Sequence, residues 1–345
     1  MGEFSGLRIL YVGQSAINGL DKRDALRELG VDLVSFDMDA VISREGRVWH
    51  SIARRAIVGP VVTSLNRELL ASARKLSGVT HVWVDKGTLL WADTLRELRD
   101  RLGAVMVHYS NDSLLWVNRS RHFMASVPVY DFHFTTKRFE LEGLRELGAR
   151  RVHLTFDAVN AERFWPRTPD ARERQRFAAD VTFVGRCERH YARCLRAAAG
   201  AGGHLRVWGA PWPGYARLHR WARPLVAGGA LWSDDYPIAL SCAKVCLGLL
   251  SKHFPETVTT RTFEIPACGS LLLAERTDDH RALFEEDAEA VYFESTDELV
   301  DKIRFYLAHD AERERIAAAG RSRFERSGYT RVNRFREILE IVTAG

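Results

Sequence analysis

Short apolar runs alternate with amphipathic helical patterns along most of the chain. In the first half, apolar runs predict strands at 7–12, 31–36, 79–84, 104–109, 129–134 and 151–155. Helical patterns fall between them at 21–29, about 47–75 with a break at Gly59-Pro60, 94–102 and 137–147. Such regular alternation predicts a parallel sheet of about six strands with helices on its faces.

The same alternation restarts near residue 180. Strands are expected at 181–184, 205–208, 245–250, 271–274 and 290–293, and helices at 189–199, 261–268, 298–308, 311–325 and 331–342. Periodicity fails over 161–179, which contains two prolines and many charges and is therefore predicted to be a linker. A chain of 345 residues is also long for a single core.

These patterns predict an α/β protein with two doubly wound domains. The expected boundaries are 1–160 for the first domain, 161–179 for the linker and 180–328 for the second domain. Residues 329–345 are expected to form a C-terminal helix that can cross back to the first domain.

The stretch from Lys244 to Ala274 carries the densest chemistry. An apolar strand leads into a polar loop at 251–260, followed by a short helix and a second strand, which together predict a βαβ unit. The loop lies beyond the carboxyl end of a strand and before a helix, where open α/β sheets bind ligands. Its side chains suit phosphate and sugar hydroxyls: Lys252, His253, Glu256, Thr257, Thr259, Thr260 and Arg261.

Composition narrows the classes of partner. The net charge is +5, but only seven of the 50 basic residues are lysine, and no basic stripe with interleaved aromatic residues is visible. This argues against nucleic-acid binding. The five cysteines lack paired spacing and are expected to be reduced. No signal-like start and no apolar run of membrane-spanning length is found, so a soluble, cytoplasmic protein is expected.

Polar groups follow the predicted strands of the first half as well. The first loop, which contains Gly13, lacks the GxGxxG spacing of dinucleotide sites, so it is either open to a ligand or a tight turn. Asp37 and Asp39 imitate a metal-binding DxD pair, but we interpret them as loop residues. Lys86 follows the third strand, where it either faces the cleft or occupies a turn.

Several local motifs resemble a known family. They are Val-Asp-Lys-Gly (84–87), Asn111-Asp112, DVTFVGR (180–186), VWGAPW (207–212), RTFEIPACGSLLLAE (261–275) and the tail at 286–324. In this order they resemble the GT-B glycosyltransferases, and among these the glycosyl-transferase-group-1-like family that includes the CgeB spore-maturation proteins. The resemblance covers most of the chain and is most specific from about 180 to 330.

The resemblance implies transfer of a sugar from a nucleotide-diphosphate sugar, such as a UDP-sugar, to an acceptor hydroxyl. The fold would be that of GT-B, with two Rossmann-like, doubly wound domains that face each other across a cleft. The donor would bind mainly to the second domain and the acceptor to the first, with no metal and no other cofactor. Basic side chains and a helix N-terminus would neutralise the leaving diphosphate. The residues implied for donor binding are Gly13, Gly185, Arg186, Lys252, Thr260, Arg261, Thr262 and Glu264.

The resemblance also implies catalytic roles. Glu256 and Glu264 have the spacing of the paired glutamates of many retaining GT-B enzymes. Glu264 would then bind the ribose hydroxyls and Glu256 would face the donor sugar, the alternative for each being a solvated or capping side chain. A retaining mechanism is favoured slightly over an inverting one.

In an inverting enzyme, a general base on the first domain would activate the acceptor hydroxyl. Asp112 and His108 are the candidates, with helix capping as the alternative for Asp112. Lys86 and Asn111 are expected on the acceptor side of the cleft.

Other functions stay open at this point. A sugar-nucleotide epimerase or hydrolase can share the fold, and so can a non-catalytic structural protein. The acceptor can be a glycan, a lipid-linked glycan, a protein or a small molecule. The basic, tryptophan-rich stretch at 211–225 leaves a peripheral membrane contact open, and nothing in the sequence indicates an oligomeric state.

Overall fold

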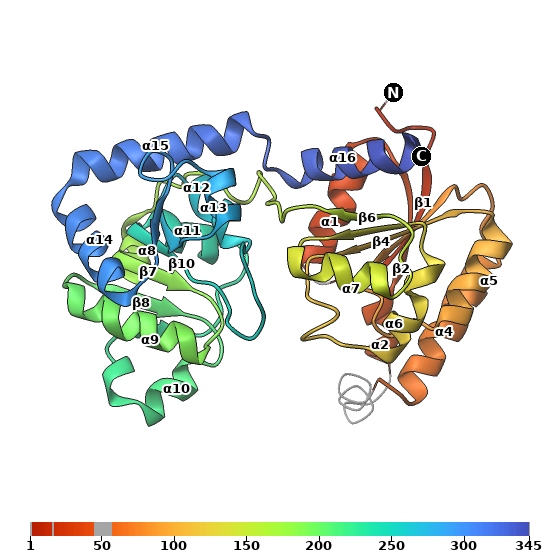
Figure 1. Cartoon of the computed structure of the whole chain (residues 1–345), viewed down its shortest axis with the longest axis horizontal. Coiled ribbons are helices and arrows are strands. Elements are labelled where there is room, and N and C mark those ends of the chain that lie inside the picture. Colours follow the sequence, from red (N-terminus) through yellow and green to blue (C-terminus); the bar gives the residue numbers. More distant parts are fainter. Residues whose placement is uncertain (1, 16, 45–56, 345) are drawn as a thin grey trace. The chain divides into compact units, whose positions relative to one another are not determined.

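The computed structural model describes residues 2–15, 17–44 and 57–344, which form two compact units (Figure 1). The first unit comprises Met1–Phe156 and Arg331–Gly345, and the second comprises Asp157–Thr330. The part of the predicted 47–75 helix that precedes residue 57 lies outside the described residues.

The first unit contains a six-stranded parallel sheet, as predicted. Its order is β2-β1-β3-β4-β5-β6, and every pairing is parallel. The strands are β1 (Arg8–Gly13), β2 (Asp32–Asp37), β3 (His81–Asp85), β4 (Val105–Ser110), β5 (Phe132–Thr135) and β6 (Val152–Leu154). The chain order of neighbours reverses between β1 and β3, which makes this the topological switch point of the sheet.

Alternate residues of these strands build two cores, one on each face. Ile9 and Tyr11 face a core shared with α1 and α16, whereas Leu10 and Val12 face a core shared with α2, α4 and α5. The helices are α1 (Ile17–Glu28), α2 (Met38–Ile42), α4 (Pro60–Ala73), α5 (Ala92–Leu102), α6 (Arg121–Ser126), η1 (Val127–Val129), η2 (Arg138–Glu140), α7 (Leu141–Glu146) and α16 (Arg331–Ala344).

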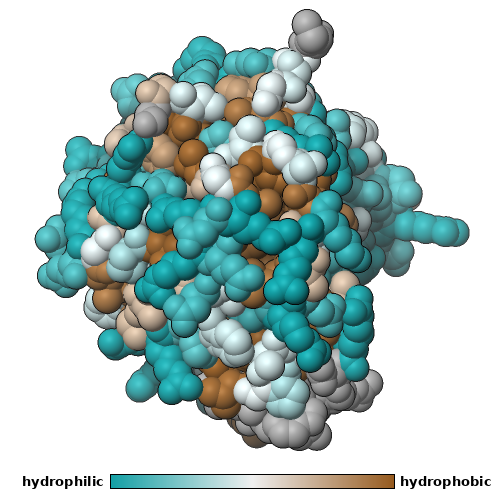
Figure 2. Space-filling model, turned by 90° about the vertical axis from the view of Figure 1, so that its right-hand side faces the viewer, coloured by the Kyte–Doolittle hydropathy of each residue, from teal (hydrophilic) through white to brown (hydrophobic). Residues whose placement is uncertain are grey.

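The C-terminal helix belongs to the first unit. Figure 1 shows α16, in blue, beside the red α1. Phe335, Ile338, Leu339 and Val342 of α16 are buried in the same core as Trp83 of β3. Figure 2 views the molecule from the side of this unit and shows hydrophilic residues over most of that face, with apolar residues between them.

The second unit also contains six parallel strands, but in a different order, β12-β11-β10-β7-β8-β9. The switch point therefore lies between β7 and β10. The strands are β7 (Ala179–Val184), β8 (Leu205–Trp208), β9 (Val226–Gly228), β10 (Ala243–Gly248), β11 (Leu271–Glu275) and β12 (Val291–Phe293). The short β9 was not predicted, because three residues carry no detectable period.

Helices cover this second sheet too. They are α8 (Ala171–Phe177), α9 (Arg189–Ala198), η3 (Ala199–Ala201), α10 (Trp212–Leu218), η4 (Arg220–Ala222), α11 (Asp235–Ser241), α12 (Arg261–Ala267), α13 (Asp278–Leu283), α14 (Thr296–Ala308) and α15 (Asp310–Arg326). The sequence predicted neither α10 nor α13. Residues 161–179, predicted as a linker, lie in this unit and include α8, which a capping box of Asp170 and Glu173 starts and the buried Phe177 anchors.

Candidate functional site

The switch point of the second sheet gathers most of the predicted donor residues. Gly185 and Arg186 follow β7, and the loop at 249–260 follows β10, its neighbour in the sheet. In open α/β sheets, the crevice beyond these strand ends is where ligands bind. The fold thus brings together two segments that are more than 60 residues apart in the sequence.

Arg261 spans this switch point. Its Nη2 donates a hydrogen bond to the carbonyl oxygen of Leu249 after β10 (2.8 Å), and its Nη1 lies 3.5 Å from the carbonyl oxygen of Val184 in β7. Gly185 makes room for the guanidinium, because a Cβ atom at this position would lie 2.9 Å from Nη1. The glycine predicted for donor contact therefore also has a packing role, and Arg261 joins the two strand ends.

Glu256 and Glu264 both act on the charge of Arg261. Burial lowers the pKa of Arg261, but the neighbouring tyrosines and these two glutamates outweigh it and raise the pKa overall. Glu264 is only 9% exposed, and its Oε2 accepts a hydrogen bond from the Tyr236 hydroxyl at 2.6 Å. Glu256 accepts from the Ser251 amide at 3.1 Å. The paired spacing read from the sequence thus corresponds to one electrostatic cluster.

Burial also dominates the chemistry of Glu264. Burial raises the pKa of its carboxyl, while hydrogen bonds from Tyr236 and Thr260 and the charge of Arg261 act to lower it, and the net direction is upward. The Tyr236 phenol is driven the same way, far above its usual pKa, first by burial and then by the Glu264 charge. The pair is a carboxylate with an oriented hydroxyl, a combination suited to vicinal sugar hydroxyls.

The start of α12 is largely satisfied by its own chain. The amides of Phe263 and Glu264 donate to the Thr260 carbonyl at 2.9 Å, and the Thr262 amide donates to Thr259 at 3.1 Å. The Thr262 hydroxyl lies 2.8 Å from Nε2 of the buried His280. Thr262 is only 1% exposed, so the structure places the side chain predicted for donor contact inside the unit.

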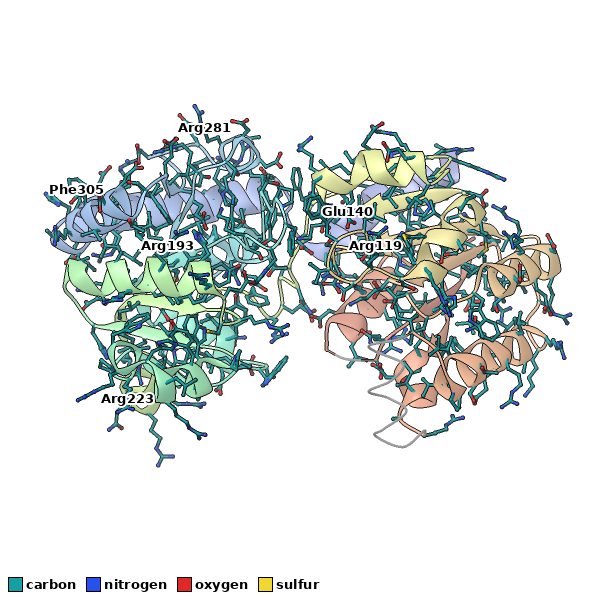
Figure 3. All side chains as sticks on the ribbon, turned by 60° about the horizontal axis from the view of Figure 1, so that its bottom comes forward. Arg119, Glu140, Arg193, Arg223, Arg281 and Phe305 are labelled. Atoms are coloured by element: carbon teal, nitrogen blue, oxygen red, sulfur yellow. The ribbon has the colours of Figure 1, made fainter. Side chains whose placement is uncertain are left out.

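A cavity of about 420 Å³ opens beside α9 in this unit. Figure 3 labels Arg193, which projects from α9. The cavity is lined by Glu188, Arg189, His190, Arg193, Lys252 and His253. Of these residues the sequence had singled out only Lys252 and His253, although the i, i+4 spacing of Arg189 and Arg193 at the start of a helix was a usable signal.

Charges around the cavity are unequally matched. Lys252 pairs with Glu275 at 2.6 Å, and Oε1 of Glu275 also accepts from the Leu250 amide at 2.7 Å and lies 3.0 Å from Nε2 of His190. Burial acts to raise the pKa of Glu275, but these partners lower it overall. By contrast, Arg186 and Arg189 are exposed and form no hydrogen bond or ion pair with the described residues. Their charge is therefore not matched by a described carboxylate and is available to a ligand.

The switch point of the first sheet is built differently. Lys22 of α1 and Asp85 at the end of β3 form a buried ion pair at 2.8 Å, and the Tyr11 hydroxyl donates to the same carboxylate at 2.8 Å. Gly13 ends β1 beside them, and a Cβ atom there would lie 2.6 Å from Cε1 of Tyr11. Gly13 thus belongs to the first unit, unlike the other residues predicted for donor binding.

The predicted acceptor residues continue this network. Asn111 Oδ1 accepts from Lys22 Nζ at 3.3 Å, and Lys86 pairs with Asp112 at 2.6 Å. Burial acts to raise the pKa of Asp112, but Lys86, Lys22 and Lys137 lower it overall. A carboxylate held this firmly as an anion can accept hydrogen bonds but is a weak base.

Lys86 has an uncommon backbone conformation. Its φ is +70°, a left-handed conformation that is uncommon outside glycine and costs of the order of 1 kcal/mol or more. The conformation leaves the ammonium bonded to Asp112. Such strain is often found at ligand-binding edges.

His108 lies elsewhere. Its ring is 1% exposed, its Nδ1 is 3.1 Å from Nδ1 of His133, and Phe123 and Tyr130 pack around it. Burial lowers the pKa of His108 well below its usual value. The structure therefore places this candidate base in the core, away from Asp112 at the loop, and its catalytic role stays a prediction.

The prediction that Asp37 and Asp39 are loop residues was wrong. Asp37 ends β2 and caps α2 by accepting from the amides of Asp39 and Ala40, and Asp39 lies in α2 and accepts from the Ser15 amide. No three His, Cys, Asp or Glu side chains within 2–15, 17–44 and 57–344 are grouped to hold a metal ion. In the same ranges, none of the helices combines the length and apolar character needed to cross a membrane.

Comparisons with known proteins match the second unit to a family. Residues 186–340 match the family described as glycosyl transferase-like, which covers the loop at 249–260, Arg261 and Glu264. A search of curated proteins finds no match.

Solved structures resemble the whole chain. Sucrose-phosphate synthase from Thermosynechococcus elongatus has a TM-score of 0.71 at 14% identity, covering 98% of this chain and 99% of that one. A glycosyltransferase from Rickettsia africae has a TM-score of 0.68 at 13% identity, covering 97% of each chain. HepE of Anabaena, solved in complex with UDP-glucose, has a TM-score of 0.65 at 11% identity, covering 98% and 100%.

These similarities confirm the predicted fold class. Both units have the Rossmann-like architecture of the GT-B proteins. Together, these findings show that the chain has the GT-B fold and that residues 186–340 are similar to the glycosyl transferase-like family.

Proposed function

We propose that this protein is a glycosyltransferase that binds a UDP-sugar at the switch point of the second unit. It transfers the sugar with retention of configuration and without a metal ion to an acceptor hydroxyl held by the first unit. The observation that carries the proposal is the cluster of Arg261, Glu256 and Glu264 at the ends of β7 and β10. This cluster lies within the segment that matches the glycosyl transferase-like family.

Donor recognition is assigned to Glu264 with its Tyr236 partner. A carboxylate can accept hydrogen bonds from two vicinal hydroxyls, as a ribose presents them. The buried hydrogen bond from the Tyr236 hydroxyl at 2.6 Å keeps the Glu264 carboxylate oriented. UDP as the nucleotide is supported by the related HepE of Anabaena, solved with UDP and glucose, and by a pneumococcal O-GlcNAc transferase solved with UDP and GlcNAc. The latter has a TM-score of 0.51 at 15% identity and covers 82% of this chain.

Diphosphate neutralisation is assigned to arginines. Arg186 and Arg189 are exposed at the end of β7 and the start of α9, and neither has a partner among the described residues. Charge-assisted hydrogen bonds from guanidinium groups to phosphate oxygens stabilise the negative charge that grows on the leaving group. Lys252 contributes less directly, because Glu275 already matches its charge.

Retention is supported by the state of the acceptor edge. Asp112 is the carboxylate predicted as a general base at this edge. Three lysines lower its pKa, which makes it a poor general base. In the proposed reaction, the bond from the anomeric carbon to the donor phosphate breaks, the acceptor oxygen bonds to that carbon on the same face, and the leaving phosphate takes the acceptor's proton. Glu256 faces the donor sugar in this scheme.

A thermal-shift titration tests donor binding. UDP at about 100 times its Kd is expected to raise the unfolding free energy by about 2.7 kcal/mol and Tm by roughly 5–10 °C. Glu264→Ala is expected to remove this shift, whereas Glu314→Gln, an exposed glutamate of α15, keeps it. If UDP, GDP, dTDP and ADP all leave Tm unchanged, the donor proposal is wrong.

Turnover tests the reaction class. Screening nucleotide-sugar consumption with and without glycosyl acceptors is expected to show acceptor-dependent release of UDP, unchanged after chelation of divalent ions. Proton NMR of the product then reads the anomeric configuration. Consumption that never depends on an acceptor would instead support an epimerase or hydrolase.

A further inference from the structure

The loop that follows β4 begins with two predicted acceptor residues and also carries an exposed aromatic side chain. Trp116 is 57% exposed and the adjacent Val117 is 56% exposed. Single exposed apolar side chains are normal on a protein surface, so the exposure matters here only together with the rigid support and the polar groups of the same loop. Asn111 and Asp112 begin the same loop.

Several hydrogen bonds hold the loop at 113–118 in one conformation. Oε1 of Glu140, which is 1% exposed, accepts from the Ser113 hydroxyl at 2.8 Å and from the Leu115 amide at 2.7 Å. The backbone and side-chain amides of Asn118 both donate to the Ser113 carbonyl at 3.1 Å. Figure 3 labels Glu140 on the first unit. Burying a carboxylate costs free energy unless hydrogen bonds satisfy its oxygens. Here the donors come from the loop, so the same hydrogen bonds also fix the loop.

Apolar contacts complete the support. Leu114 is buried in a small core with Phe123, Val127 and Leu144. The Trp116 ring meets the edge of Phe139, with centroids 5.9 Å apart and planes at 84°. The indole is therefore positioned before any ligand arrives, which lowers the entropic cost of binding.

Hydrogen bonds also hold the polar residues at the start of the same loop. The Ser110 hydroxyl bonds to the amide and the carbonyl of Asp112, and the Thr136 hydroxyl donates to the Asn111 carbonyl. The loop thus carries an aromatic face, an amide and a carboxylate paired with Lys86. Ligand sites typically combine an apolar surface with a few fixed polar groups in this way.

A pyranose ring matches this combination. One of its faces presents C–H groups, whose slight positive charge favours an aromatic face, while its equatorial hydroxyls point outward to hydrogen-bonding groups. We propose that Trp116 is the stacking platform of an acceptor subsite for a pyranoside, with Asn111 and Asp112 binding its hydroxyls. This inference rests on the proposed function, because it names the acceptor class of the same enzyme.

A lipid surface is the competing occupant. Arg119, exposed in the same loop region, would favour anionic lipid, but only two exposed apolar side chains are available for insertion. Membrane anchoring usually needs a broader apolar face combined with several cations. Hydroxyl-binding groups beside a single aromatic ring fit a sugar better.

Saturation-transfer NMR on the full chain tests the subsite directly. The probes are methyl gluco-, galacto- and mannopyranoside, with sorbitol as an acyclic polyol that lacks a ring face. At least one pyranoside is expected to show saturation at its axial ring protons, and Trp116→Ala is expected to remove it. Trp116→Phe is expected to keep part of it. Leu218→Ala, which removes an 82% exposed side chain from α10, serves as the matched control and is expected to leave it unchanged.

Kinetics provide the second readout. Trp116→Ala is expected to raise the acceptor KM about tenfold, the scale of losing a well-placed aromatic contact, without changing the UDP-induced Tm shift. Glu140 acts as a positioning residue, so Glu140→Ala is expected to raise the KM for the sugar acceptor as well. Glu140→Gln keeps an oxygen that accepts the hydrogen bonds of the loop, and it is expected to restore this KM.

Two results would overturn the subsite. One is a pyranoside signal that is equal in wild type and Trp116→Ala, or absent for all probes, while UDP still shifts Tm. The other is loss of binding to phosphatidylglycerol vesicles in Trp116→Ala with no change toward pyranosides. Conversely, Trp116-dependent pyranoside binding without any nucleotide shift would reject the proposed donor and leave this subsite standing.

Discussion

The carboxyl edges of the two sheets differ in how their charges are matched. In the first unit, Lys22 and Lys86 are each paired with an aspartate, so the edge is polar but largely self-neutralised. In the second unit, Arg261 is bonded to the strand ends, while Arg186 and Arg189 have no partners among the described residues. An edge with unmatched cations suits a diphosphate, and a neutralised edge with an exposed indole suits an uncharged polyol.

The two edges also differ in the type of basic residue, with lysine at the first sheet and arginine at the second. Arginine binds phosphate in a bidentate manner and is weakly hydrated, whereas lysine is a compact charge that one carboxylate can match. Three of the seven lysines in this arginine-rich chain, Lys22, Lys86 and Lys137, act on Asp112 of the first unit. The two sheets share an architecture but present different chemistry at the same edge.

Removing Lys22 is expected to have the largest effect on the first unit. Lys22→Met leaves Asp85 buried without its cation, which typically costs about 3–5 kcal/mol of unfolding free energy. Urea denaturation measures this loss. The double variant Lys22→Met, Asp85→Leu is expected to recover much of it, and a double variant no more stable than the single one would show that the pair is not the cause.

The glycines at the two strand ends sharpen the comparison. Gly185→Ala places a Cβ atom 2.6 Å from Cζ of Phe183 and 2.9 Å from Arg261, so we expect a loss of about 1–3 kcal/mol and weaker UDP binding. Gly13→Ala, which meets Tyr11 at 2.6 Å, is the matched control in the first unit. It is expected to destabilise similarly but to leave the UDP affinity of the folded protein unchanged. Equal effects on UDP affinity would break the distinction between the edges.

Lowering the pH is expected to destabilise both units to a similar extent, and by less than the substitutions above. Burial lowers the pKa of His133 in the first unit and of His280 in the second to about 4, from about 6.5. Above pH 6.5 both states are neutral. As the pH falls from 6.5 to 4, the unfolded chain gains protons that the folded chain does not, so stability falls, by about 1.4 kcal/mol per histidine at pH 5.5. Denaturation midpoints that stay constant from pH 7 to 5 would contradict this.

Part of this arrangement could be predicted from the sequence. The apolar runs predicted both six-stranded sheets closely, except for the three-residue β9, and the motif around Glu264 lies in the segment that matches the glycosyl transferase-like family. Strand patterns are local, and buried parallel strands have strong apolar signatures.

The rest depends on contacts between distant residues. Lys22 meets Asp85 across 63 positions and Tyr236 meets Glu264 across 28, and no local pattern encodes such partners. His108 looked like a strand-end base, but its register in β4 turns it into the core. Glu140, which fixes the loop bearing Trp116, had no signal beyond its charge.

The most direct test of the charge difference is calorimetric titration of UDP into three proteins. Wild type is compared with the double variant Arg186→Gln, Arg189→Gln in the second unit and with Lys86→Gln in the first. The double variant is expected to weaken UDP binding at least tenfold, because each lost charge-assisted hydrogen bond contributes about 1.5–3 kcal/mol. Lys86→Gln is expected to bind like wild type. UDP affinity that is unchanged in the double variant, or that falls only with Lys86→Gln, would contradict the assignment of the donor to the second unit.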